Sequence, residues 1–113
     1  MEEKNQLRED SIEFAIRVSD LCDEIKGCAV FVNQVVRSSS SIGANIHEAK
    51  YAQSRADFIN KLEIALKECS ETEYWLELLI ESEYYYDKTI LDRCVEVKRI
   101  LIASIRTAKE SAK

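Results

Sequence analysis

Proline and glycine, the residues that most readily form turns, are almost absent from this chain, and this limits its possible folds more than any other feature. There is no proline, and the only glycines are Gly27 and Gly43. An all-β domain needs turn residues roughly every 8–12 positions, whereas long helices need few. With 113 residues, 46% of them hydrophobic, the chain can bury a core of its own. The sequence therefore predicts one all-α domain over residues 1–113.

Hydrophobic periodicity divides the chain into four amphipathic helices joined by short loops, and short loops make neighbouring helices antiparallel. The predicted helices lie at about 8–26, 29–53, 55–83 and 88–109. Gly27 is expected to end the first helix in the left-handed conformation. Ser54 is expected to cap the third by accepting a hydrogen bond from the N–H of Asp57, and Asp87 to cap the fourth. The predicted fold is an antiparallel up-down four-helix bundle.

The second helix contains a run of serines from Ser38 to Ser41, followed by Gly43, and all of these are poor helix formers. A break here would leave a fragment too short to span the bundle. We therefore predict a continuous helix, held by packing, in which the small side chains allow close approach of a neighbour.

Helical spacing also predicts which side chains face the core. For the first helix the predicted core face is Ile12, Ala15, Ile16, Ser19, Cys22 and Ile25. For the fourth helix it is Ile90, Cys94, Val97, Leu101, Ile105 and Ala108. Leu91, Val95 and Ile102 belong to the fourth helix but fall outside its predicted core face. They predict a contact with another protein chain, although single aliphatic residues are also common on protein surfaces.

The net charge is −5, but residues 88–113 contain seven Lys and Arg against three Asp and Glu. Lys98, Arg99, Arg106 and Lys109 lie on one side of the fourth helix and are candidate contacts to nucleic-acid phosphates. The alternative is a solvated helix face, with cations placed favourably near a helix C-terminus.

The sequence contains no recognisable catalytic or metal-binding motif. The only histidine is His47, so the paired Glu-x-x-His motifs of di-iron bundles are absent, and there is no glycine-rich phosphate loop. We expect no enzyme activity, no cofactor, no metal and no small-molecule substrate. The four cysteines are expected to be free thiols of a cytoplasmic protein, and no apolar run is long enough to enter a membrane.

Several polar residues are predicted to make structural contacts. Asn45 falls near the apolar side of its helix, where an amide must find hydrogen bonds and can fix the register of a bundle or oligomer. Pairing the second and third helices back from their joint brings Glu48 near Lys61 and Arg37 near Glu71. Together with Ser54 and Asp57, Asn45 and Glu48 form the predicted structural polar motif.

Three blocks of sequence resemble the four-helix-bundle family encoded in 23S ribosomal RNA intervening sequences. They are Ser41-Ile42-Gly43-Ala44-Asn45-Ile46-His47-Glu48-Ala49, Ser54-Arg55-Ala56-Asp57-Phe58, and Ile64-Ala65-Leu66-Lys67-Glu68 through Glu71-Thr72-Glu73-Tyr74-Trp75-Leu76. The resemblance implies an antiparallel bundle that forms a ring-like homopentamer. The accessory variability determinant of diversity-generating retroelements is similar in fold, and its basic pentamer engages nucleic acid and a reverse transcriptase.

From these observations we expect a non-enzymatic, homo-oligomeric helical bundle that acts as an interaction scaffold, with copies of itself as partners. The alternative is an RNA- or nucleoprotein-binding protein that uses the basic face of the fourth helix.

Overall fold

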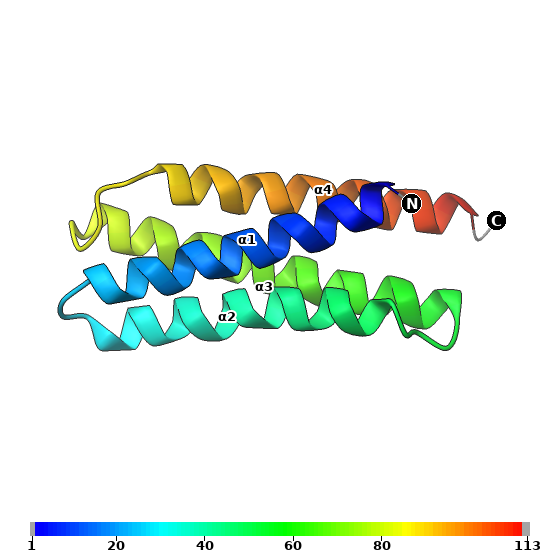
Figure 1. The fold of residues 1–113 in the computed structure, drawn as a ribbon, viewed down its shortest axis with the longest axis horizontal. Coiled ribbons are helices and arrows are strands. Elements are labelled where there is room, and N and C mark those ends of the chain that lie inside the picture. The colour runs from blue at the N-terminus through cyan, green and yellow to red at the C-terminus, as the bar shows by residue number, and fades with distance from the viewer. Residues whose placement is uncertain (1, 112–113) are drawn as a thin grey trace.

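A computed structural model describes residues 2–111, with side chains from Gln6 to Ser111, and it confirms the all-α four-helix bundle. The helices are α1 (Glu2–Glu24), α2 (Ala29–Ala49), α3 (Arg55–Glu81) and α4 (Thr89–Ser111). Successive helices run in opposite directions, so α1 begins and α4 ends at the same end of the molecule (Figure 1).

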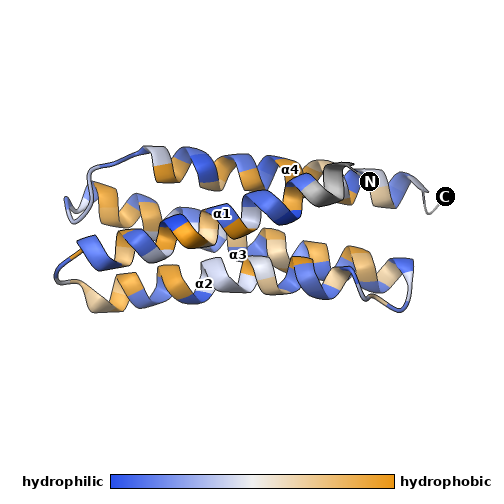
Figure 2. Ribbon diagram, viewed as in Figure 1, coloured by the Kyte–Doolittle hydropathy of each residue, from blue (hydrophilic) through white to orange (hydrophobic). Residues whose placement is uncertain are grey.

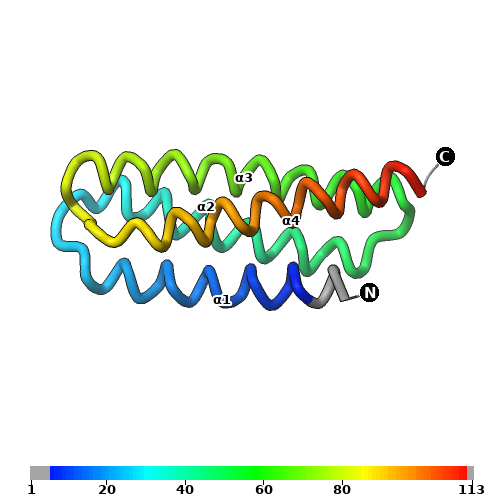
Figure 3. Tube along the Cα trace, turned by 90° about the horizontal axis from the view of Figure 1, so that it is seen from above, coloured from blue at the N-terminus to red at the C-terminus, as the bar shows by residue number. Residues whose placement is uncertain are grey.

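The bundle is elongated, measuring 48 × 20 × 19 Å. Each helix packs against two others: α2 and α4 each contact both α1 and α3, while α1 and α3 do not adjoin. Figure 3 shows α1 and α3 at opposite edges, with α2 and α4 between them. The contact between α2 and α3 is the most extensive of the four.

Two helix boundaries differ from the predicted ones by four residues or more, and the others differ by two residues at most. α1 begins at Glu2 rather than near Arg8, because the Glu, Lys and Gln residues before Arg8 are good helix formers. α2 ends at Ala49 rather than Gln53. Residues 50–53, which were predicted to be helical, form tight turns instead, and the N–H of Ala52 donates to the carbonyl of Ala49 at 3.1 Å. These turns leave Ser54 free to start the next helix.

The predicted continuity of α2 through its serine run is confirmed. Figure 2 shows this run as a pale stretch in the middle of the helix. Ser38 and Ser39 are buried, and the hydroxyl of Ser38 donates to the carbonyl of Gln34 at 2.8 Å, one turn back. The hydroxyl of Thr72 on α3 lies 2.7 Å from that of Ser38. The small side chain of Ser38 therefore lies where α2 and α3 approach each other.

The loop between α1 and α2, the first joint of the bundle, has the expected left-handed backbone at Gly27. Gly27 has φ +92°, and a Cβ there would lie 3.6 Å from a ring carbon of Tyr84 in the third joint. Cys28, which precedes α2, is also left-handed, with φ 51°. In the third joint, the carboxylate of Asp87 accepts hydrogen bonds from the N–H and the hydroxyl of Thr89, the first residue of α4. These bonds lower the pKa of Asp87.

The predicted cap of α3 is present, and its removal gives a first test. The N–H of Asp57 donates to Ser54 Oγ at 3.0 Å, and Asp57 Oδ2 accepts from the N–H of Gln53 at 3.3 Å. We expect Ser54→Ala to lower the free energy of unfolding by about 1 kcal/mol, because a helix N–H loses its partner. Urea denaturation measures this change. Ser70→Ala, on the exposed side of α3, is the control and should not destabilise the protein; equal losses in both variants would contradict the capping role.

The predicted core face of α4 is confirmed, since all six of its residues are buried. The predicted face of α1 is wrong. Ile12 and Ile16 are 43% and 57% exposed, respectively. The residues of α1 that enter the core are Leu7, Ser11, Phe14, Val18 and Leu21. These residues are spaced alternately four and three apart, which keeps one stripe of the helix against its neighbours. This stripe has larger side chains than the predicted face.

Candidate interaction surfaces

The apolar residues predicted on the outside of α4 form a partly exposed strip. Val95 and Ile102 are each 37% exposed. Leu91 is half-buried and packs against the core, so it offers less free surface than the other two. We call Leu91, Val95 and Ile102 the α4 outer strip. The strip provides an apolar surface of two to three side chains on an otherwise charged helix face.

Three of the four predicted phosphate contacts on α4 are paired with carboxylates. Lys98 Nζ lies 2.8 Å from Glu73 Oε1, and this hydrogen bond raises the pKa of Lys98. Lys109 Nζ lies 3.1 Å from a carboxylate oxygen of Glu63.

Arg99 is likewise within 3.1 Å of Glu96, whereas Arg106 has no carboxylate within 4.0 Å among side chains 6–111. A phosphate would have to displace these carboxylates to bind the three paired cations. The positive charge predicted from the sequence is thus largely balanced by α3 and by α4 itself.

The predicted ion pairs between α2 and α3 are confirmed. Lys61 Nζ lies 3.1 Å from Glu48 Oε1. Arg37 pairs with Glu71 and also lies 3.3 Å from Glu68. Both clusters are partly exposed, which limits each pair to less than about 1 kcal/mol of stabilisation.

Asn45 makes its hydrogen bond within its own helix. Its Nδ2 donates to the carbonyl of Ser41 at 2.9 Å and lies 3.2 Å from Ser41 Oγ. The side chain is half-buried and makes no hydrogen bond to another helix among the described side chains. Asn45 therefore does not set the register between helices within this chain.

The structure brings together two cysteines that sequence spacing did not connect. Cys69 on α3 and Cys94 on α4 are fully buried, and their sulfurs are 3.9 Å apart. Cys69 Sγ lies 3.4 Å from the carbonyl oxygen of Cys94, and Cys94 Sγ lies 3.6 Å from that of Cys69. The hydrogen bond with Cys69, followed by burial, raises the pKa of the Cys94 thiol. Both thiols thus belong to the packing of α3 on α4.

This burial predicts a division of thiol reactivity. In the folded protein we expect an aromatic disulfide reagent to modify Cys22 and Cys28 and to leave Cys69 and Cys94 unmodified, because only a thiolate reached by solvent reacts. Cys22 should react more slowly than an unhindered thiol, since burial raises its pKa. Released thiolate is measured by absorbance, with and without urea. A Cys22→Ser/Cys28→Ser variant is the control, and its rapid modification in the absence of urea would contradict the burial of the α3–α4 pair.

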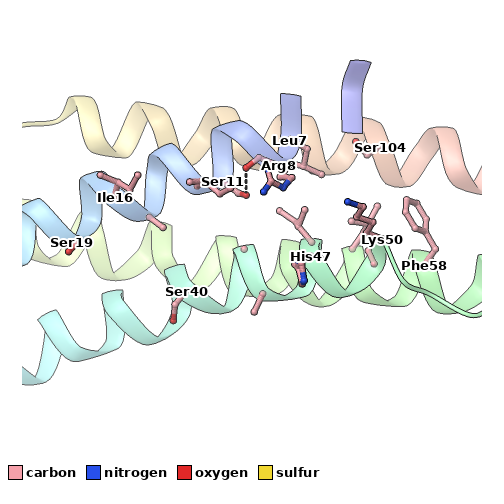
Figure 4. Close-up of a pocket in the computed structure, with 17 residues that line it drawn as sticks. Leu7, Arg8, Ser11, Ile16, Ser19, Ser40, His47, Lys50, Phe58 and Ser104 are labelled. Carbon is pink, nitrogen blue, oxygen red and sulfur yellow. Dashed lines mark hydrogen bonds between the residues drawn. The ribbon is translucent and has the colours of Figure 1, made fainter. Parts of the chain in front are cut away.

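A hollow that was not predicted from the sequence lies between α1 and α2. Its volume is about 680 Å³. The lining residues are Leu7, Arg8, Ser11, Ile12, Ala15, Ile16, Ser19, Ser40, Gly43, Ala44, Ile46, His47, Ala49, Lys50, Phe58, Leu62 and Ser104 (Figure 4). We call this hollow the α1–α2 groove.

Small residues of α2 and exposed isoleucines of α1 shape the groove. Ser40, Gly43 and Ala44 contribute little side-chain volume, and a Cβ added at Gly43 would meet nothing within 4 Å. Ile12 and Ile16, assigned to the core from the sequence, line the opposite side. A second apolar stripe on the first helix, beside the one that enters the core, was the sequence signal for this surface.

Two cations lie at one end of the α1–α2 groove. Arg8 of α1 and Lys50, just after α2, both line it, and Figure 4 shows their side chains at the same end. Among side chains 6–111, no carboxylate oxygen lies within 4.0 Å of the charged nitrogens of either residue. The groove is therefore mostly apolar, with two cations at one end that have no carboxylate partner among side chains 6–111; Lys50 Nζ lies 5.7 Å from the centre of the Tyr51 ring.

The described residues offer neither a metal-binding cluster nor a membrane-spanning helix. Their His, Cys, Asp and Glu side chains form no group of three that could hold a metal ion. None of the helices in this part of the chain has an apolar stretch long enough to cross a membrane.

Comparisons with known proteins agree with the helical architecture. Residues 3–103 match the family described as 23S rRNA-intervening sequence protein. The curated proteins include no match. A crystal structure of a protein with unknown function, from the S23 ribosomal protein family of Bacteroides thetaiotaomicron, is 47% identical. The similarity covers 92% of this chain and 98% of that one, with a TM-score of 0.87. Because the family match spans most of the chain, this protein belongs to the 23S rRNA-intervening sequence protein family.

Proposed function

We propose that this protein is a non-enzymatic helical bundle that assembles with copies of itself and serves as an interaction scaffold. The observation that supports self-assembly is the α4 outer strip. Val95 and Ile102 are two turns apart, each more than a third exposed, and removing such side chains from water is favourable.

The resemblance to the intervening-sequence family supports a closed ring as the form of assembly. A ring with more than two copies joins two different surfaces of neighbouring subunits, so that each copy offers one surface and receives the other. In our proposal the α4 outer strip is one of these two surfaces. Because it contains only two or three apolar side chains, charged and polar residues around it must contribute to the contact.

RNA binding through α4 is the less favoured alternative. Affinity for phosphate grows with the number of cations that release counterions on binding. Lys98, Arg99 and Lys109 already have carboxylate partners, so each would exchange one ion pair for another. Any retention of ribosomal RNA should therefore be weak and should fall steeply between low and physiological salt.

Light scattering after size-exclusion chromatography tests the proposed assembly. At micromolar concentration the protein should have a mass that is a multiple of the 13.0 kDa chain. A Val95→Glu/Ile102→Glu variant should shift toward 13.0 kDa, because each carboxylate would have to lose its water to enter the apolar contact. Its circular dichroism should be unchanged, since both residues lie on the surface.

Val30→Glu is the matched control, as Val30 is an exposed apolar residue at the start of α2. This variant should keep the mass of the unmodified protein. A single 13.0 kDa species for the unmodified protein would refute self-assembly. An unchanged mass for the double α4 variant would remove the α4 outer strip from the contact.

A further inference from the structure

We propose that the α1–α2 groove binds a linear amphiphile that has one apolar chain and a carboxylate at one end. This inference goes beyond the scaffold function and does not depend on it. It rests on three features of the groove: its size and shape, its apolar lining, and the position of its charges.

The size and lining are those of a ligand site. Small-molecule sites are mostly apolar clefts of about 300–1,000 Å³ with a few placed polar groups, and the groove has about 680 Å³. Along α1 it extends from Leu7 to Ser19, which corresponds to about 18 Å of helix at 1.5 Å per residue. A hollow that follows a helix over this length suits an extended chain better than a compact ring system.

The charges give the groove a direction. Because α1 and α2 are antiparallel, Arg8 near the start of α1 and Lys50 after the end of α2 lie at the same end. The opposite end is lined by Ile16, Ser19 and Ser40, which carry no charge. An apolar channel with cations at one end complements an apolar chain with an anion at one end.

The chemistry of the two cations favours a carboxylate as the anion. A guanidinium and an ammonium group both form charge-assisted hydrogen bonds with carboxylate oxygens. Neither Arg8 nor Lys50 has such a partner among side chains 6–111. Binding would therefore not require an existing ion pair to break, unlike at Lys98 and Lys109.

The α4 outer strip of a second copy fits the groove less well. Arg106 lies on that part of α4, one turn beyond Ile102, and it has no carboxylate within 4.0 Å among side chains 6–111. Docking the strip would bring further positive charge toward Arg8 and Lys50. Like charges that meet across a contact oppose association, so the charge pattern favours an anionic occupant.

Calorimetric titration of the full chain with decanoate, below the concentration at which it forms micelles, tests the proposal. We expect saturable binding of one decanoate per chain. Decyltrimethylammonium has the same chain length and the opposite charge, and it should bind at least about tenfold more weakly, because it would meet two cations instead of a complementary pair. Equal affinities for the two amphiphiles, or no saturable binding of decanoate, would overturn the proposal.

Two variants locate the binding to the groove. Gly43→Leu places a Cβ where nothing lies within 4 Å, and the rest of its side chain extends into the groove, so the fold should be retained while decanoate binding is lost. Ser70→Leu places the same side chain on the exposed side of α3 and should leave binding unchanged. If Gly43→Leu still binds decanoate as the unmodified protein does, the ligand lies elsewhere and the proposal fails.

Arg8→Gln/Lys50→Gln tests the charges separately from the cavity. Its affinity for decanoate should fall at least about tenfold, while its affinity for 1-decanol should stay the same. Arg55→Gln/Lys67→Gln removes two exposed cations of α3 outside the groove and is the matched control. An equal loss of decanoate affinity in the two double variants would show a general charge effect and overturn the assigned site.

Light scattering on the same samples keeps this inference separate from self-assembly. Gly43→Leu should keep the mass of the unmodified protein, whatever that mass is. A lower mass for this variant would show that a second copy covers the groove, which would overturn the ligand proposal while supporting assembly.

Discussion

Replacing Phe14 by alanine is expected to lower the free energy of unfolding by about 3–5 kcal/mol, the range for large aromatic side chains removed from a core. Phe14 is only 2% exposed and belongs to the stripe by which α1 enters the bundle. α1 packs only against α2 and α4, so this stripe supplies most of what holds it in place. Urea denaturation followed by circular dichroism measures the change.

Ile16→Ala on the same helix is the matched control for Phe14→Ala. Ile16 is 57% exposed at the α1–α2 groove, so its removal should cost less than about 1 kcal/mol. The pair of variants decides between the two apolar stripes of α1. A larger loss for Ile16→Ala than for Phe14→Ala would mean that α1 packs through the stripe first expected from the sequence.

Replacing Ser38 by leucine is expected to destabilise the protein by about 3 kcal/mol or more, since overpacking commonly costs 1–3 kcal/mol and a buried hydrogen bond is lost in addition. Ser38 has no exposed surface, and its hydroxyl lies 2.7 Å from that of Thr72. A leucine side chain would have to separate α2 from α3 or leave its preferred rotamers. The same urea experiment measures the loss.

Ser40→Leu provides the comparison within the same serine run. Ser40 is exposed and lines the α1–α2 groove, where an added side chain has room. Leucine is also the better helix former, so this variant should be as stable as the unmodified protein or slightly more stable. If Ser38→Leu were tolerated as well as Ser40→Leu, the close approach of α2 to α3 would not depend on small side chains.

The fold and its joints were predictable because their causes are local in the chain. The lack of proline and the helical periodicity define four helices, and Gly27, Ser54 and Asp87 act through neighbouring backbone. Two antiparallel helices joined by a short loop also have a predictable register. This is why the pairing of Glu48 with Lys61 could be expected before the structure was known.

The interaction surfaces were only partly predictable from the sequence. The α4 outer strip follows from the width of one helix's apolar face, and its position on the outside is confirmed for Val95 and Ile102. The sequence gives the number of charges on α4 but does not identify their partners. Lys98 pairs with Glu73 and Lys109 pairs with Glu63, and both glutamates lie on α3. A list of basic residues therefore overstates the positive potential of the surface.

Four antiparallel helices and the caps of α3 and α4 follow from the sequence alone, since turn chemistry and hydrophobic period act over a few residues. Which stripe of α1 is buried depends on the packing of the whole bundle. Both stripes are apolar at helical spacing, and the choice depends on how the larger side chains of Phe14 and its neighbours pack against α2 and α4. The stripe that remains outside, with Ile12 and Ile16, creates the α1–α2 groove. Such a surface arises from the packing of separate helices, and no single helix contains it.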